Sequence, residues 1–260
     1  MLLLVFVCVL PSFKVVANDN GGWYTEEKYV VGKDGPCNIE RHDANDLTEE
    51  EFLKRFAYAE PVVIYNIDNS EFGKRTTKQK MLEDWENTPV TLNSANTYSY
   101  TRVPTTFGEY LTHRLKPQNL HTLGNETMYL FGDIDRKLWA PLLSTYRIPK
   151  WTLPGHEPAL SFGIAGAGTG VPFHFHGPVF AEVIYGSKRW FVYPFEERPE
   201  FEPDHSTLEW FLKSYDSIPR EKRPLECVVK PGEAIYLPDK WWHATLNTET
   251  SVFISTFLSP

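Results

Sequence analysis

The feature that most constrains the fold is a series of short β-strand patterns that runs from residue 159 to the C-terminus. Each run is rich in β-branched and aromatic residues, and glycine, proline or asparagine separates it from the next. Short strands at such regular spacing are typical of a closed or sandwiched antiparallel sheet, a barrel or jelly roll. The expected strands cover 181–185, 189–193, 225–229, 233–237, 241–246 and 251–257, and the first two are expected to form a hairpin around Gly186 and Ser187.

Helices are expected mainly in the first part of the chain. A Ser or Thr that is followed three residues later by Glu forms the capping box that starts a helix. A further helix is expected over 135–146 and a strand over 61–67, from their apolar patterns. The three capping boxes pair Thr48 with Glu51, Thr106 with Glu109 and Ser206 with Glu209.

These patterns predict a mainly β fold with flanking α-helices. We expect one domain over 46–260, with a helical and mixed part over 46–158 and a strand-rich core from about 159 to 260, after an N-terminal extension over 18–45. Aromatic residues make up 15% of the 260 residues, which is too many for a disordered chain. The 34 acidic and 26 basic residues argue against nucleic-acid or anionic-membrane binding, because both require clustered positive charge.

The first residues indicate the compartment. Residues 2–10 form an uninterrupted apolar run that is too short to cross a bilayer as a helix. Val15 and Ala17 occupy the −3 and −1 positions of a signal-peptidase site, with Asn18 as the first mature residue. The alternative is a short buried strand. We expect residues 1–17 to be a cleaved signal peptide and the mature chain to be luminal or secreted, with no membrane span.

Two further features fit that compartment. Asn125 opens the sequence Asn-Glu-Thr, which is an acceptor site for N-glycosylation. Cys37 and Cys227 are the only cysteines of the mature chain, and an oxidising lumen favours a disulfide between them. Two buried free thiols are the alternative. The C-terminal residues are not a KDEL-type retrieval signal.

Two spaced motifs carry the candidate chemistry. His174 and His176 stand two residues apart, so that a strand would project both imidazoles onto one face. The second motif begins at Gly232 and contains His243 and Asn247. Their spacings resemble the two cupin motifs, with Lys240 at one glycine position of the second. Those motifs bring histidines together on facing strands, and imidazole suits iron, zinc, copper and nickel.

The likeness extends beyond the cupin superfamily. The segments SFGIAGAGTGVPFHFHGPVFAEVIYGSKRWFVYP and YLPDKWWHATLNTETSVFISTFL resemble a jumonji-C (JmjC) domain, and the resemblance covers roughly residues 46–260. The JmjC family implies a double-stranded β-helix and, in its active branches, Fe(II)- and 2-oxoglutarate-dependent oxygenation. The branch that this chain resembles implies the endoplasmic reticulum lumen, protein partners and a regulatory role in cytokine signalling.

The resemblance also implies site residues, and here the chain departs from the active pattern. His174 and His243 fall on the two iron-binding histidines, but His176 replaces the carboxylate between them. Lys188 falls on the lysine that pairs with the distal carboxylate of 2-oxoglutarate. Val171 and Phe257 stand where related enzymes often carry polar side chains.

Two functions are therefore open. One is a luminal regulatory protein that binds partners and keeps a divergent three-histidine metal site. The other is an Fe(II)- and 2-oxoglutarate-dependent protein hydroxylase or demethylase. Zinc is an alternative metal, since three histidines and a water form a known zinc arrangement. The sequence indicates neither the partner nor the oligomeric state.

Overall fold

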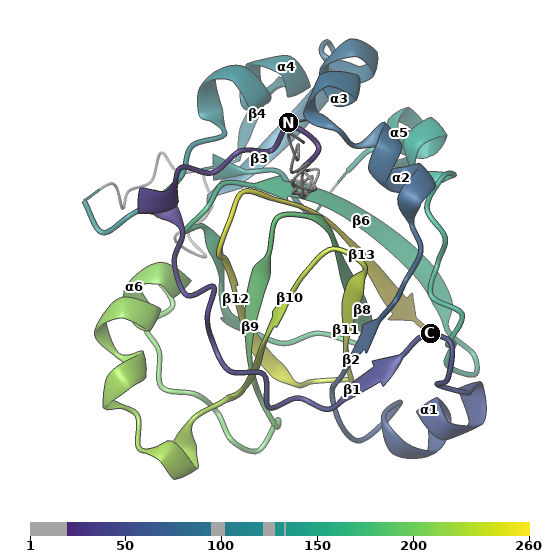
Figure 1. The fold of residues 1–260 in the computed structure, drawn as a ribbon, viewed down its shortest axis with the longest axis vertical. Helices are drawn as coiled ribbons and strands as arrows, with labels where there is room; N and C mark the ends of the chain where they lie inside the picture. The colour runs from purple at the N-terminus through teal and green to yellow at the C-terminus, as the bar shows by residue number, and fades with distance from the viewer. Residues whose placement is uncertain (1–19, 95–101, 122–127, 133) are drawn as a thin grey trace, which may run out of the picture.

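Two β-sheets face each other around a common interior (Figure 1). The computed structural model describes residues 20–94, 102–121, 128–132 and 134–260. The larger sheet has six strands in the order β1-β2-β11-β8-β13-β6, the smaller has four in the order β10-β9-β12-β7, and β4-β3-β5 form a separate three-stranded sheet. The strands are β1 (Arg41–Asp43), β2 (Val62–Tyr65), β3 (Pro89–Ser94), β4 (Val103–Thr106), β5 (Met128–Tyr129), β6 (Glu157–Ala165), β7 (Gly170–His174), β8 (Val179–Tyr185), β9 (Lys188–Tyr193), β10 (Leu225–Val229), β11 (Glu233–Leu237), β12 (Trp242–Asn247) and β13 (Ser251–Ser259).

Apart from β9 and β10, which pair with each other, consecutive strands from β6 to β13 alternate between the two large sheets. The chain passes from β8 to β9, from β10 to β11 and from β12 to β13, and each step crosses from one sheet to the other. This is the double-stranded β-helix, or jelly roll, so the predicted fold class is confirmed. The predicted hairpin is wrong, because β8 pairs with β11 and β13 whereas β9 pairs with β10 and β12.

The corner at Gly186 explains why the short turn does not close a hairpin. Gly186 has a φ of 76°, in the left-handed region, and a Cβ there would overlap the carbonyl oxygen of Thr250. The turn therefore packs against the loop between β12 and β13 and sends the chain into the opposite sheet. A two-residue turn in the sequence does not by itself distinguish a hairpin from such a corner.

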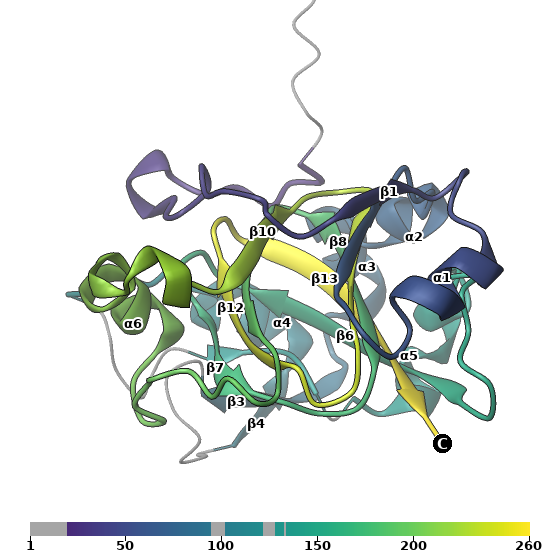
Figure 2. The ribbon, with the colours of Figure 1, turned by 90° about the horizontal axis from the view of Figure 1, so that it is seen from below.

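Alternation of side chains separates the interior from the outer layers. Val179, Ala181 and Val183 of β8 face the interior, where they pack with Trp190 and Val192 of β9. The residues between them face outward, against the helical layer. Figures 1 and 2 show α2, α3 and α5 beside the large sheet and α6 beside the small one. The helices are α1 (Glu49–Arg55), α2 (Ser70–Arg75), α3 (Lys78–Trp85), α4 (Phe107–Glu109), α5 (Arg136–Leu143) and α6 (Thr207–Lys213).

The three predicted capping boxes all cap helices. Thr48 Oγ1, Thr106 Oγ1 and Ser206 Oγ accept hydrogen bonds from the backbone N–H three residues later, at 3.1, 3.3 and 3.1 Å. The expected helix over 135–146 is shorter, and α5 ends at Leu143. The expected strand over 61–67 is β2, which joins the large sheet between β1 and β11.

The N-terminal segment runs across the small sheet before it enters the large one as β1 (Figure 2). Trp23 anchors its start, since the ring is buried and its Nε1 donates to the Thr76 carbonyl at 2.9 Å. Cys37 forms a disulfide with Cys227 of β10, across 190 positions of sequence. The predicted pairing is thus present, and the alternative of free thiols is not observed.

Several expectations are left open. The signal peptide over 1–17 and the sequon at Asn125 lie outside the described residues. None of the helices in the described ranges is long and apolar enough to cross a membrane. The division into an extension over 18–45 and a domain over 46–260 stays a prediction.

Glu182 is a buried carboxyl group on the outward face of β8. The residue is 1% exposed, and its Oε2 accepts hydrogen bonds from Asn69 Nδ2 at 2.8 Å and from the Tyr146 hydroxyl at 2.9 Å. Burial outweighs these two hydrogen bonds and raises the pKa of Glu182 to about 7. The folded chain therefore keeps a proton on Glu182 at pH values at which the unfolded chain has lost it.

This shift makes stability depend on pH. The stability that protonated Glu182 contributes is fully present below a pH of about 4.5 and is lost as the pH rises through about 7. Glu182→Gln removes the ionisation and keeps an acceptor for Asn69 and Tyr146. We expect the free energy of unfolding of the variant, minus that of the wild type, to rise by up to about 3 kcal/mol from acid to alkaline pH. Urea unfolding at a series of pH values measures this, and parallel pH profiles for the two proteins would contradict it.

Candidate metal centre

Three histidines meet at one end of the small sheet. His174 is the last residue of β7, and His243 lies directly opposite it in the register of β12. Gly170 lets β7 approach β12 closely, because a Cβ there would overlap the carbonyl oxygen of Thr245. His176 follows β7, and its carbonyl oxygen accepts a hydrogen bond from the Lys240 N–H at 2.9 Å.

Lys240 explains one departure from the cupin pattern. It occupies a glycine position of the second motif, and its φ is 63°, in the left-handed region that favours glycine. The residue therefore keeps the backbone conformation of the motif despite its side chain. Its backbone N–H binds the carbonyl of His176 and so holds His176 beside His243. The two histidines are 67 positions apart in the sequence but adjacent in space.

The orientation of each imidazole is set by a backbone carbonyl. Nδ1 of His174 donates to Pro172 O at 2.8 Å, Nδ1 of His176 donates to Gly177 O at 2.7 Å, and Nδ1 of His243 donates to Trp241 O at 2.8 Å. A carbonyl can only accept, so the proton of each neutral ring is on Nδ1. Each Nε2 is thus left with a free lone pair.

These lone pairs converge. The ligand atoms of the three histidines all lie within 4.8 Å of one another, and Nε2 of His176 is 3.1 Å from Nε2 of His243. Two unprotonated nitrogens at that distance repel each other unless a cation lies between them. Burial lowers the pKa of His174 to about 4 and lowers the pKa of His176 and of His243 as well, so a proton is disfavoured in that position.

A divalent metal fits this donor set. Imidazole nitrogen is a good ligand for iron, zinc, copper and nickel, and Nδ1–H bonds to carbonyls are the usual support of metal-bound histidine. Within the described ranges the cluster holds no carboxylate. His174, His176 and His243 would therefore hold the ion without contributing negative charge.

Lys188 lies deeper in the interior, at the start of β9. The residue is 5% exposed, and its ammonium nitrogen lies 3.4 Å from the centre of the Phe253 ring. Burial lowers the pKa of Lys188 to about 7. No carboxylate among the described residues pairs with this ammonium. The neighbouring inward residue, Trp190, is also 5% exposed, and its Nε1–H has no acceptor in the described part of the chain.

Lys188 and Trp190 are two buried donors on one strand that have no acceptor among the described residues, an arrangement that an anion would satisfy. Lys188 and Trp190 are two residues apart, so both face the interior of the barrel. A carboxylate placed between them would satisfy both donors and restore the charge of the lysine. The residues present thus fit a dicarboxylate such as 2-oxoglutarate at its distal end.

Comparisons with known proteins show the family of this chain. A family model for a cupin-like domain matches residues 166–257. JmjC domain-containing protein 8 of Rattus norvegicus is 47% identical over 99% of this chain and 97% of that protein, and the protein of the same name from Homo sapiens is 48% identical over 93% of this chain and 91% of that protein. This chain belongs to the JmjC domain-containing protein 8 family.

More distant relatives carry enzyme names. The bifunctional arginine demethylase and lysyl-hydroxylase psr-1 of Caenorhabditis elegans is 24% identical over 84% of this chain and 60% of that protein. The structure of YcfD, a ribosomal oxygenase from Escherichia coli, superposes with a TM-score of 0.53 at 19% identity, and covers 83% of this chain and 52% of that chain. This structural likeness supports the fold of the family and no more.

The remaining sequence candidates lie around the cluster or away from it. Phe257 packs edge-on against His176, with ring centres 5.0 Å apart, so an apolar ring borders the metal site. Val171 lies on β7 and donates its N–H to Thr245 Oγ1 at 3.2 Å. Trp190 was not expected as a donor, although its two-residue spacing from Lys188 is visible in the sequence. The other described histidines lie outside the cluster: His42, His113, His121, His156 and His205.

For this family member we expect one equivalent of divalent metal to bind to the wild type. His174→Ala and His243→Ala each remove one converging nitrogen, and we expect each to weaken binding by on the order of 100-fold or more. Competition of Co²⁺ with a chromophoric chelator measures the affinity. His205→Ala is the matched control, because that histidine is exposed, lies outside the cluster and pairs with Glu209. Equal affinity in all four proteins would refute the assignment.

Proposed function

We propose that this chain is a secretory-pathway JmjC protein that binds a divalent metal and regulates protein partners by binding them, with little or no oxygenase turnover. The observation that carries the proposal is the donor set, in which three imidazoles converge and His176 stands in the place of a carboxylate. The endoplasmic reticulum lumen is the compartment we propose. The apolar run over 2–10, the sequon at Asn125 and the disulfide support it.

The missing carboxylate alters the charge of the centre. A two-histidine, one-carboxylate set contributes one negative charge to the metal, whereas three neutral imidazoles contribute none. When bound, the metal supplies Lewis acidity and open positions for an anionic ligand. Because the neutral set disfavours higher oxidation states, this chain favours stable binding of a divalent ion over redox turnover. Phe257 and the buried rings around Lys188 keep the site apolar.

A groove on the outer side of the small sheet supports the binding role. It has a volume of about 810 Å³ and lies between α6 and the loop over 196–205. Aromatic rings line it, and several glutamates at its rim form no ion pair among the described residues. Five glutamates line the groove against three basic residues, Arg198, Lys213 and Lys222, so the surface suits a partner segment that carries positive charge beside apolar side chains. The rings belong to Tyr193, Phe201 and Trp210, and the glutamates are Glu197, Glu200 and Glu202.

The second candidate is an Fe(II)- and 2-oxoglutarate-dependent protein hydroxylase or demethylase. Lys188 and Trp190 favour it, because two buried donors without acceptors fit the distal carboxylate of 2-oxoglutarate. The enzyme names of distant relatives also favour it. The same two donors fit the first candidate equally, with 2-oxoglutarate as a bound ligand that is not turned over.

The two functions are separated by His176→Asp. This change restores a two-histidine, one-carboxylate set, and we expect it to raise uncoupled 2-oxoglutarate consumption by about tenfold or more over the wild type. Succinate formation with added Fe(II), ascorbate and oxygen measures the turnover, and metal content is determined in each sample. The double variant His176→Asp/Lys188→Met should lose this increase in 2-oxoglutarate consumption, because it lacks the ammonium that would pair with the distal carboxylate. Faster turnover by the wild type than by His176→Asp would overturn the proposal in favour of the oxygenase.

A further inference from the structure

The disulfide that joins the N-terminal segment to β10 has two unlike ends. Cys37 lies in an exposed loop, whereas Cys227 is fully buried in the interior between the sheets, beside Trp190 and Val192. A nucleophile in solution therefore reaches Cys37 Sγ but not Cys227 Sγ. Attack on Cys37 would make Cys227 the leaving group.

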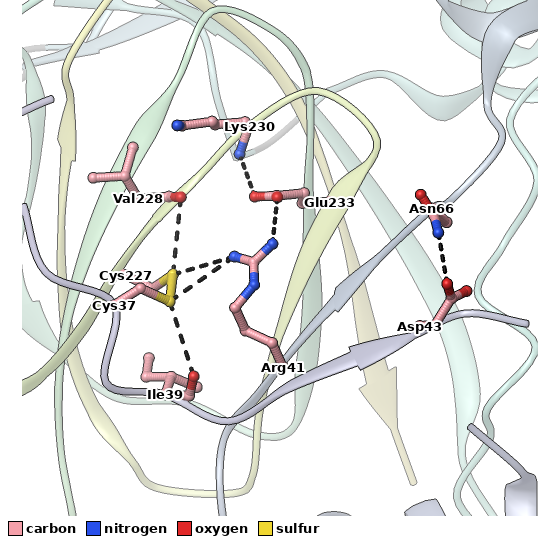
Figure 3. A network of polar contacts seen from close by, with 9 residues as sticks. All are labelled: Cys37, Ile39, Arg41, Asp43, Asn66, Cys227, Val228, Lys230 and Glu233. Carbon is pink, nitrogen blue, oxygen red and sulfur yellow. Dashed lines mark hydrogen bonds and ion pairs between the residues drawn. A yellow bond between two sulfur atoms is a disulfide. The ribbon is translucent and has the colours of Figure 1, made fainter. Parts of the chain in front are cut away.

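A guanidinium group lies against both sulfur atoms (Figure 3). Nη1 of Arg41 is 3.9 Å from Cys37 Sγ and 3.7 Å from Cys227 Sγ. The carbonyls of Ile39 and Val228 also approach the sulfurs, but they are acceptors and a disulfide has no proton to donate. Arg41 is the donor that the described residues direct at this bond.

Arg41 is held in this position by its own contacts. Its Nη2 donates to Glu233 Oε1 at 2.6 Å, and Glu233 Oε2 accepts from the Lys230 N–H at 3.0 Å. The guanidinium carbon also lies 5.5 Å from the centre of the Tyr65 ring. Because one edge of the guanidinium is fixed on Glu233, the other edge stays directed at the sulfurs, as Figure 3 shows.

We propose that the Cys37–Cys227 disulfide is a thiol-exchange site. The thiolate of an external thiol attacks Cys37 Sγ, a new disulfide forms between that thiol and Cys37, and the Cys37–Cys227 bond breaks with both electrons on Cys227. The resulting Cys227 thiolate lies beside Arg41. A thiolate in an apolar interior is a poor leaving group, and the adjacent guanidinium offsets this effect by pairing with the developing negative charge. The inference is independent of the metal site.

The exchange would act on the segment that crosses the small sheet. Asn38 exchanges two hydrogen bonds with Glu226 of β10, at 3.0 and 2.6 Å, and Gly32 O accepts from Arg189 at 3.3 Å. Together with the Lys33–Glu249 ion pair and the buried Ile39 side chain, these contacts would hold residues 32–40 in place after exchange. The product is a mixed disulfide that tethers the thiol to the exposed edge of the molecule at Cys37.

Incubation of the full chain with reduced glutathione tests the proposal. After quenching with acid and alkylation, peptide mass spectrometry locates the glutathione adduct and follows its rate of formation. We expect the adduct on Cys37 and an alkylated thiol on Cys227. We expect Arg41→Gln to slow the exchange by about tenfold and Arg41→Lys to remain near the wild-type rate. Arg147→Gln is the matched control, since that arginine pairs with Asp68 in an exposed ion pair elsewhere.

Two results would overturn the proposal. One is an adduct on Cys227 in the wild type, a result that requires no variant and does not depend on how any variant folds. The other is an equal rate for the wild type and Arg41→Gln while both show the same circular dichroism and the same melting temperature. If Arg41→Gln shows altered circular dichroism, its rate is set aside, and the position of the adduct in the wild type decides the proposal.

Discussion

The pairing of β12 with both β7 and β9 is the constraint on which the site depends. Through β7, it sets His243 opposite His174, and through β9 it sets Asn247 opposite Lys188. His174, His243 and the buried lysine therefore lie on one four-stranded sheet, at fixed positions along neighbouring strands, and His176 follows β7 directly. A register shift of one residue would turn His243 to the outer face and leave two histidines.

Much of this could be predicted from the sequence, because the signals are local. The two-residue spacing of His174 and His176 and the distant His243 predicted the cluster, and the capping boxes predicted three helix starts. The sheet in which each strand lies could not be predicted, since Gly186 acts as a corner only when the loop at Thr250 packs against it. The predicted hairpin failed for that reason.

Features that arise from burial could also not be predicted from the sequence. The family resemblance indicates Lys188, but Trp190 looks like an ordinary strand residue until the fold removes it from water and leaves its Nε1–H without an acceptor among the described residues. Arg41 is 186 positions from Cys227, and only the fold of the N-terminal segment brings the guanidinium to the sulfur. In each case the chemistry follows from long-range packing and not from a motif.

The donor set and the anion site together account for a protein that keeps the JmjC scaffold with altered chemistry. In the proposed function, three carbonyl-tethered imidazoles would provide a neutral metal centre, and the buried ammonium would provide the charge that attracts a carboxylate. This combination would bind metal and anion without the carboxylate ligand that accompanies oxygen chemistry in the two-histidine, one-carboxylate sites.

X-ray absorption spectroscopy at the metal edge, on the anaerobically purified full chain, tests the central claim most directly. The account expects stoichiometric metal and a first shell with the multiple-scattering signature of three imidazoles. A protein that cannot be loaded with stoichiometric metal, or a metal bound by two or fewer imidazoles together with a protein carboxylate, would contradict it.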